Sequence, residues 1–461
     1  MNKERRLFKE RTLWIVVTAF LAAVILLLTF APRVLAGNQE AETQRLLEMF
    51  FEVFHFVQKN YVEEEKVDPD ILVEGALRGM FEALDDPHSA YLSPEEMRDL
   101  DDTTTGRFGG VGLIISKIDR GVEVVSPIEG TPAYRAGVSA GDLIVAVDGE
   151  SVVDLNIDEV LSVLRGEPGS SVTMTIVRGK NLRFDVRVVR DMIEVPTVRE
   201  DMIPDGIAYL RVIQFTPLTT DRVEDAILDF EDRGYDSMII DLRSNPGGLL
   251  SGVINVADFF LSKGPIVNTR SRVASENHVF YASSRNTIVP PDLPIVVLID
   301  RGSASASEIL AGALQDTGRA TIMGEKSYGK GSVQQIKRVG DAGFRLTMSR
   351  YYTPLGKNID QIGISPDIPV QEAEFSEEEE QALSRIIDEE LIKDFLSLYP
   401  NPTDQDISSF ERELENKNIR LDDRYIRRLV RNEVNRTNNN PPVYDLEFDL
   451  VLQEAVNYLR D

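Results

Sequence analysis

Residues 301–310, RGSASASEIL, follow directly on LPIVVLID (293–300) and contain three serines that alternate with alanines. The run LPIVVLI is wholly apolar, which is typical of a strand buried on both faces of a helix-covered sheet. Ser305 and Glu308 fit the S-x-x-E capping box that begins a helix. A strand-to-helix turn also suits a nucleophilic serine. The stretch therefore predicts a helix cap, a catalytic serine, or both.

The flanking sequence extends this order of strands and helices over residues 192–370. A second apolar run, SMIIDL (237–242), also predicts a buried strand. Helical patterns occur at TTDRVEDAILDFEDRG (219–234) and ASEILAGALQDTGR (306–319). Interleaved strands and helices are typical of an α/β domain.

The bulk composition limits the chemistry of the chain. Its 461 residues suffice for about three domains of roughly 150 residues each. The net charge of −27 argues against a nucleic-acid-binding protein. No cysteine is present, which removes disulfides, thiolate nucleophiles and cysteine metal sites. The histidines are scattered without an H-E-x-x-H pattern, so we expect no metal site and no cofactor.

The three histidines, His55, His88 and His278, also limit nucleophilic catalysis, because a Ser-His-Asp triad would need one of them. His55 lies in an apolar helical pattern and is interpreted as a packed side chain. His88 follows Pro87 and is interpreted as a loop residue. A serine nucleophile in this chain therefore calls for a different base.

The N-terminus predicts export. Residues 1–11 are rich in basic side chains, and the uncharged run TLWIVVTAFLAAVILLLTFA (12–31) is long enough to cross a bilayer. Basic residues before such a span place that end in the cytoplasm and the rest of the chain outside it. A signal peptide cleaved after Ala36 is the alternative. The length of the run favours a retained anchor, so residues 1–36 are interpreted as a membrane anchor or signal segment.

Two further regions are predicted to be helical. Residues 38–105 carry apolar positions at three- and four-residue spacing, over TQRLLEMFFEVFHFVQKNYV and DPDILVEGALRGMFEAL. Residues 371–461 are acidic and mostly helical, and the sequence indicates no role for them.

Residues 106–191 change to short alternating strands and glycine turns. The stretch GTPAYRAGVSAGDLIVAVDGESV (130–152) resembles a PDZ domain, and GGVG (109–112) stands where that family has its carboxylate-binding loop. Successive backbone amides in such a loop can hold a peptide C-terminus while the peptide extends a sheet edge. Arg165 is either a partner of that carboxylate or of the α/β domain at 192–370, or an exposed structural arginine. The predicted loop residues are Gly109, Gly110, Val111 and Gly112.

The stretch GEKSYGKGSVQQ (324–335) has three interpretations. Residues 324–330 spell G-x-x-x-x-G-K, but Gly331 replaces the Ser or Thr of a phosphate-binding loop and a strand pattern follows. Ser327 and Lys330 spell S-x-x-K, although glycines disfavour the helical turn which that motif needs. In the third interpretation, desolvated Lys330 is the base for a serine elsewhere.

A second resemblance favours this third interpretation. The stretch GSASASEILAGALQDTGRATIMGEKSYGKGSVQQ (302–335) is similar throughout to the C-terminal processing peptidases, or tail-specific proteases. These enzymes use a serine–lysine dyad, which the resemblance assigns to Ser305 and Lys330. It also implies that Gln334 orients the lysine. Asp316 matches the aspartate assigned in other members, but we rank it lower, because a carboxylate would raise the lysine pKa. We interpret Asp316 as a surface residue at the end of a helix.

The oxyanion hole is expected at two places. Ser305 at a helix start leaves the Ala306 amide unpaired. The family's NPGG motif, here residues 245–248, implies a second donor at Gly247 or Gly248. Over residues 40–370 the resemblance implies a multidomain α+β protein. Its parts are a helical N-terminal region, a PDZ β-barrel-like domain and a crotonase-like α/β serine protease domain, and the helical C-terminal tail over residues 371–461 follows outside the resemblance.

The expected function is an extracytoplasmic serine endopeptidase of the bacterial cell membrane. It would bind protein or peptide substrates by their C-termini through the PDZ domain and cleave nearby, for processing or degradation of envelope proteins. A cleaved N-terminal segment would make it a secreted protein. One alternative is a catalytically silent PDZ scaffold, and another is an ATP-coupled enzyme using residues 324–331. The sequence leaves open the substrate and whether the chain forms a homo-oligomer.

Overall fold

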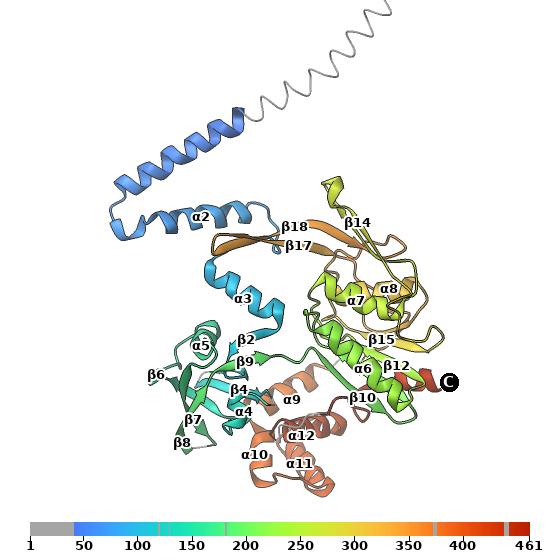
Figure 1. Cartoon of the computed structure of the whole chain (residues 1–461). Coiled ribbons are helices and arrows are strands. Elements are labelled where there is room, and N and C mark those ends of the chain that lie inside the picture. Colours follow the sequence, from blue (N-terminus) through green and yellow to red (C-terminus); the bar gives the residue numbers. More distant parts are fainter. Residues whose placement is uncertain (1–40, 119, 129, 180–181, 372–375, 438–441) are drawn as a thin grey trace, which may run out of the picture. The chain divides into compact units, whose positions relative to one another are not determined.

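The computed structural model describes residues 41–461 except 119, 129, 180–181, 372–375 and 438–441 (Figure 1). The chain divides into two compact units, Met1–Tyr91 and Leu92–Asp461. In the described part, no helix has both the length and the apolar character needed to span a bilayer. The predicted anchor over residues 12–31 lies outside the described residues.

The first unit is helical, as its apolar spacing predicts. Residues 41–60 form a helix, followed by η1 (Glu64–Lys66) and α2 (Pro69–Glu82). Asp68 caps α2 by accepting a hydrogen bond from the Asp70 backbone N–H at 2.8 Å. The prediction that His55 is packed was wrong. It is exposed, because the apolar face of its helix, Phe56 included, is not covered within the described residues of this unit.

The boundary between the units falls within β1 (Ala90–Leu92), whose last residue, Leu92, starts the second unit. Helix α3 (Pro94–Thr105) follows. The PDZ-like region follows with an antiparallel sheet in the order β3-β4-β5-β7-β8 and its own valine-rich core. The strands of the whole PDZ-like region are β2 (Arg107–Gly110), β3 (Leu113–Ile118), β4 (Gly121–Pro127), β5 (Leu143–Val147), β6 (Glu150–Ser151), β7 (Ser171–Arg178), β8 (Leu182–Val189) and β9 (Asp191–Glu194). Its helices are α4 (Pro132–Arg135) and α5 (Ile157–Leu164).

The next region is built on a mostly parallel sheet in the order β10-β11-β12-β15-β16-β19. Its strands are β10 (Val198–Ile203), β11 (Ile207–Val212), β12 (Ser237–Asp241), β15 (Ile295–Ile299), β16 (Thr321–Gly324) and β19 (Ile368–Pro369). Its helices are α6 (Thr219–Arg233), α7 (Leu250–Phe260) and α8 (Ala306–Asp316). A second, antiparallel sheet contains β13 (Pro265–Ser271), β14 (His278–Tyr281), β17 (Ser332–Val339) and β18 (Ala342–Tyr352), with η2 (Ala274–Glu276) before β14.

Both faces of the parallel sheet are buried, which explains the uninterrupted apolar runs. Because side chains alternate along a strand, Val297 of β15 packs in the core formed with α6, α7 and α8, whereas Val296 faces the opposite side. That opposite side is covered by α13 (Leu450–Arg460), whose Leu452 is fully buried. Figure 1 draws α13 in red at the C-terminus, beside this sheet.

The remaining C-terminal helices have a core of their own, which includes Phe395 and Phe410 with stacked rings 4.4 Å apart. The acidic tail therefore divides between a separate helical cluster and one helix that covers a face of the parallel sheet. The helices of the cluster are α9 (Glu377–Asp388), α10 (Leu391–Leu398), α11 (Asp404–Asn416) and α12 (Asp423–Thr437).

Candidate active site

Three loops meet at one edge of the parallel sheet. The register pairs Asp241 with Leu298 and Ile299 with Gly324, so strands β12, β15 and β16 end together. Parallel strands of an α/β sheet present ligand-binding loops at their carboxyl ends. Here those loops contain the NPGG, SASAS and YGKG stretches, which explains how segments far apart in the sequence form one site.

The three alternating serines have different surroundings. The Ser303 hydroxyl donates to the Leu242 carbonyl at 2.8 Å, and the Ser307 hydroxyl donates to the Asn245 carbonyl at 3.0 Å. Both side chains are fully buried and hold the loop after β12. Neither caps α8. The Ser305 hydroxyl donates to no atom of the described residues, which leaves it available as a nucleophile.

Ser305 is the N-cap of α8 and has a backbone φ of 53°. A non-glycine residue with positive φ is strained and is often found where function requires it. The following N–H, that of Ala306 at the first helical position, has no partner among the described residues. Ser305 is thus both the N-cap residue of α8 and a serine whose hydroxyl donates to no described residue.

Glu308 connects the two loops of the predicted dyad, although the sequence predicted only its role in the cap. Its fully buried carboxylate accepts hydrogen bonds from the backbone N–H groups of Ser305 and Lys330, both at 2.8 Å. Its other oxygen accepts from the Ser327 hydroxyl and the Gly329 N–H, both at 2.6 Å. Burial raises the pKa of Glu308 and these hydrogen bonds lower it, with burial the larger effect.

Lys330 lies in this loop with a half-buried side chain. Burial lowers the pKa of Lys330, and the nearby positive charge of Arg345 lowers it further. No carboxylate forms an ion pair with its ammonium group in the described part of the chain. These surroundings favour the neutral amine that a general base needs.

The two predicted partners of the lysine have other contacts. The Gln334 amide donates to the Ser332 hydroxyl at 2.8 Å and to Thr347 at 3.5 Å on the neighbouring strand β18. Asp316 was interpreted as a surface residue. Instead, its side chain is 1% exposed and accepts from the Lys357 ammonium at 2.8 Å, which ties the end of α8 to the loop after β18. Within the described residues, no hydrogen bond or ion pair joins Asp316 to Lys330.

The glycines of the NPGG stretch are not equivalent. The Gly247 N–H donates to the Asn245 side chain at 2.8 Å, so it is already used. The Gly248 N–H has no acceptor among the described residues, and Gly248 has a φ of 138°. A Cβ on Gly247 would lie 2.8 Å from that of Ser305, which shows how closely this loop approaches the serine. Gly248 and Ala306 are therefore the candidate oxyanion donors.

The two competing interpretations of residues 324–331 were wrong. A phosphate-binding loop needs a helix after the lysine, but strand β17 follows instead. The S-x-x-K pair needs a helical turn, and residues 327–330 are not helical. The Ser327 hydroxyl instead bonds Glu308 and accepts from the Ile364 N–H at 2.7 Å, so it is structural.

The predicted carboxylate loop joins β2 to β3. The N–H groups of Val111 and Gly112 have no partner within the described residues, while their carbonyls accept from Ala133 and Ile128. Strand β3 is at the edge of its sheet, so its free side can pair with a peptide. At the start of the loop, Gly109 pairs with Met192 and Gly110 with Asp191.

Arg165 follows α5 and stacks on the Phe108 ring, with its guanidinium carbon 5.0 Å from the ring centroid. A Cβ added to Gly110 would lie 3.8 Å from the Cα of Arg165, so the two residues are in close contact. Arg165 therefore supports the start of the loop by packing.

Comparisons with known proteins agree with both resemblances. The model of peptidase family S41 matches residues 206–370, and a PDZ domain model matches residues 123–178. The N-terminal domain of the activating protease CtpB matches residues 32–96. A carboxy-terminal-processing protease of Bartonella bacilliformis is 42% identical over 372 residues, which cover 79% of this chain and 83% of that protein.

The carboxy-terminal processing protease CtpA of Bacillus subtilis is 31% identical over 78% of this chain and 77% of its own. The solved structure of a photosystem II D1 C-terminal processing protease is 31% identical and covers 70% of this chain and 92% of that one, with a TM-score of 0.43. The two family models and the two related proteases confirm the predicted family, and the matched PDZ and peptidase domains agree with the predicted fold class. The chain belongs to peptidase family S41, among the carboxy-terminal-processing serine proteases that carry a PDZ domain.

Proposed function

We propose that this protease is an extracytoplasmic endopeptidase in which Ser305 is the nucleophile and Lys330 the general base. The observation that carries the proposal is the Glu308 carboxylate, which bonds the backbone N–H groups of both residues at 2.8 Å. One buried side chain thus sets the distance between the two loops. The lowered pKa of Lys330 supports the assignment of the base.

In the first step, the Ser305 Oγ attacks the carbonyl carbon of the scissile peptide bond while Lys330 Nζ takes the hydroxyl proton. The N–H groups of Ala306 and Gly248 hold the oxygen that becomes negative. Collapse of the intermediate breaks the C–N bond, and Lys330 returns the proton to the leaving amine. Water, deprotonated by the same lysine, then hydrolyses the acyl-enzyme.

Substrate selection is assigned to the PDZ domain. The unpaired N–H groups of Val111 and Gly112 suit a terminal carboxylate, and edge strand β3 suits the peptide that precedes it. The apolar run at residues 12–31 supports a site of action outside the cytoplasm, next to the membrane. Envelope proteins with accessible C-termini are the substrate class that follows.

The test is proteolysis of an unfolded polypeptide by purified Ser305→Ala and Lys330→Ala. Each should abolish cleavage with the fold intact by circular dichroism, and the double variant should be no worse than either, because the two residues act as a unit. Activity that persists in folded Ser305→Ala would move the nucleophile elsewhere. A folded wild-type protein that binds C-terminal peptides without cleaving them would instead support a scaffold.

A further inference from the structure

Arg243 lies immediately after strand β12, between two carboxylates. Asp241 accepts from its Nε at 2.9 Å and from its Nη2 at 2.6 Å. Asp449 accepts from its Nη1 at 2.8 Å and from its Nη2 at 2.6 Å. Both edges of the planar guanidinium group are therefore held by bidentate pairs, which fix its orientation as well as its position.

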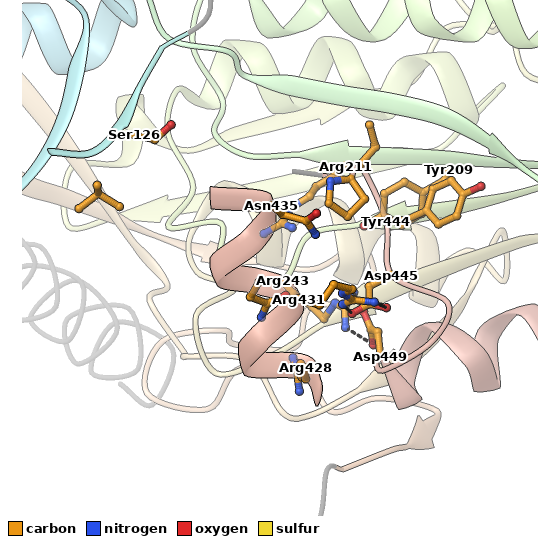
Figure 2. Close-up of a pocket in the computed structure, with 14 residues that line it drawn as sticks. Ser126, Tyr209, Arg211, Arg243, Arg428, Arg431, Asn435, Tyr444, Asp445 and Asp449 are labelled. Carbon is orange, nitrogen blue, oxygen red and sulfur yellow. Dashed lines mark hydrogen bonds and ion pairs between the residues drawn. The ribbon is translucent and has the colours of Figure 1, made fainter. Parts of the chain in front are cut away.

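The two carboxylates come from distant parts of the sequence. Asp241 ends β12, is fully buried and also accepts from the Tyr209 hydroxyl at 2.7 Å. Burial disfavours the charged form of Asp241, but Arg243 and Tyr209 outweigh burial and lower its pKa. Asp449 is the N-cap of α13 and lies beyond the end of the family match at residue 370. Figure 2 shows Arg243 and Asp449 on the wall of a cavity of about 380 Å³.

Arg243 begins the turn that leads to the candidate oxyanion donor. Its neighbour Ser244 has a φ of 57° and donates from its N–H to Asp300 at 2.8 Å. Asn245 comes next and is fully buried. Its carbonyl accepts from the Ala304 N–H at 3.0 Å, beside the nucleophile. A displaced Arg243 would therefore shift the turn that presents Gly248.

We propose that Asp449 is a positioning residue for catalysis, which holds Arg243 so that the turn after β12 presents the Gly248 N–H to the oxyanion. The C-terminal helix is then part of the catalytic machinery and not an appendage. This inference rests on the proposed Ser305 mechanism. It assigns a role to a segment that lies outside the matched family region.

The test compares kcat and KM of Asp449→Asn with those of the wild type. Asparagine keeps the helix cap and the side-chain shape but removes the charge. We expect kcat to fall about ten-fold or more with KM changed less than about two-fold, since small misplacements in an active site strongly reduce the rate. A peptide boronate, which forms a tetrahedral adduct with the serine, should bind more weakly by the same factor. Asp449→Glu keeps the charge and should recover part of kcat.

Asp205→Asn is the matched control. It breaks the other ion pair of α13, between Arg460 Nη2 and Asp205 Oδ2 at 2.6 Å, which does not touch Arg243. Equal kcat in folded Asp449→Asn and Asp205→Asn would overturn the inference. If Asp449→Asn does not fold, Arg243→Lys replaces it, because lysine cannot form the two bidentate pairs. Wild-type kcat in folded Arg243→Lys would overturn the inference equally.

Ser305→Ala, measured in the same assay, separates the two proposals. Cleavage by folded Ser305→Ala would refute the proposed nucleophile. An inactive Ser305→Ala together with an unaffected Asp449→Asn would refute only the role of Asp449.

Discussion

At the scale of single residues, the lowered pKa of Lys330 goes with the absence of an ion-paired carboxylate among the described residues. Glu308, which bonds the Lys330 backbone N–H, and Asp316, the aspartate that the resemblance offered, both have other partners: Glu308 bonds backbone N–H groups and Asp316 holds Lys357. The charged group that does act on Lys330 is Arg345, which repels its ammonium form. Burial and like charge therefore act in the same direction, toward a neutral amine.

The pH dependence of cleavage follows from this arrangement. Activity should rise with pH through the lowered pKa of Lys330, because only the neutral amine can accept the serine proton. Arg345→Gln removes the repelling charge, so the pKa of Lys330 should rise and the kcat/KM profile should move to higher pH. The control is Arg350→Gln on the same strand, whose arginine pairs with Asp360 at 3.1 Å. A profile that moves to lower pH in Arg345→Gln would contradict the assigned base.

The residue scale also shows how far the sequence could go. Motif resemblance selects Ser305 and Lys330. The residue types alone do not separate Ser305 from Ser303 and Ser307, whose hydroxyls bond carbonyls at the end of β12 and in the loop after it. Likewise, the sequence could not separate Gly247 from Gly248. The difference between them is the hydrogen bond from the Gly247 N–H to the Asn245 side chain, which forms only when the turn is folded. Such choices depend on the path of the backbone, which a residue pattern does not contain.

At the scale of elements, α8 and the loop after β16 are joined by a single carboxylate. Glu308 meets four donors, and each belongs to one of these two segments. The carboxylate is fully buried, and a buried donor that loses its acceptor is destabilising. The geometry of the dyad therefore depends on the Glu308 side chain.

Glu308→Gln tests this dependence. Glutamine has one acceptor oxygen and an amide that is itself a donor, so it would face at least one of the four donors with an N–H group. Each buried donor left unpaired costs about 1–3 kcal/mol, so we expect a lower Tm and a loss of kcat. Ser303→Ala is a useful comparison, because it also removes a buried hydrogen bond but leaves the backbone N–H groups of Ser305 and Lys330 paired with Glu308. A folded Glu308→Gln that retains wild-type kcat would show that the carboxylate is not required.

The elements themselves were predicted well where the pattern is local. The apolar runs at 237–242 and 293–299 became β12 and β15, and the helical pattern from Ala306 became α8. The role of α13 could not be predicted, since its apolar face looks like that of any amphipathic helix. Its partner is a sheet face formed by strands far earlier in the chain. The spacing of apolar residues within one segment does not show which distant segment it packs against.

At the scale of the whole molecule, recognition and cleavage are assigned to different domains. The PDZ domain has its own core and an edge strand, and the protease domain has a separate core around its parallel sheet. Because the two domains belong to one chain, binding of the substrate tail by the PDZ domain raises the local concentration of the scissile bond at the protease domain. The proposed function therefore predicts that a distant carboxylate affects the rate of cleavage.

Amidating the C-terminus of a peptide substrate should lower kcat/KM about ten- to a hundred-fold, because a charge-assisted contact is worth about 1.5–3 kcal/mol. Gly112→Ala should reduce this difference. The residue has a φ of 80°, and an added Cβ would lie 2.3 Å from the Thr131 side chain, so the loop must shift. Gly137→Ala is the matched control, with a φ of 78° and no atom within 4 Å of its Cβ. It should keep the wild-type ratio of the two rates. Equal rates for the free and the amidated peptide in the wild-type protein would exclude recognition of the tail by this loop.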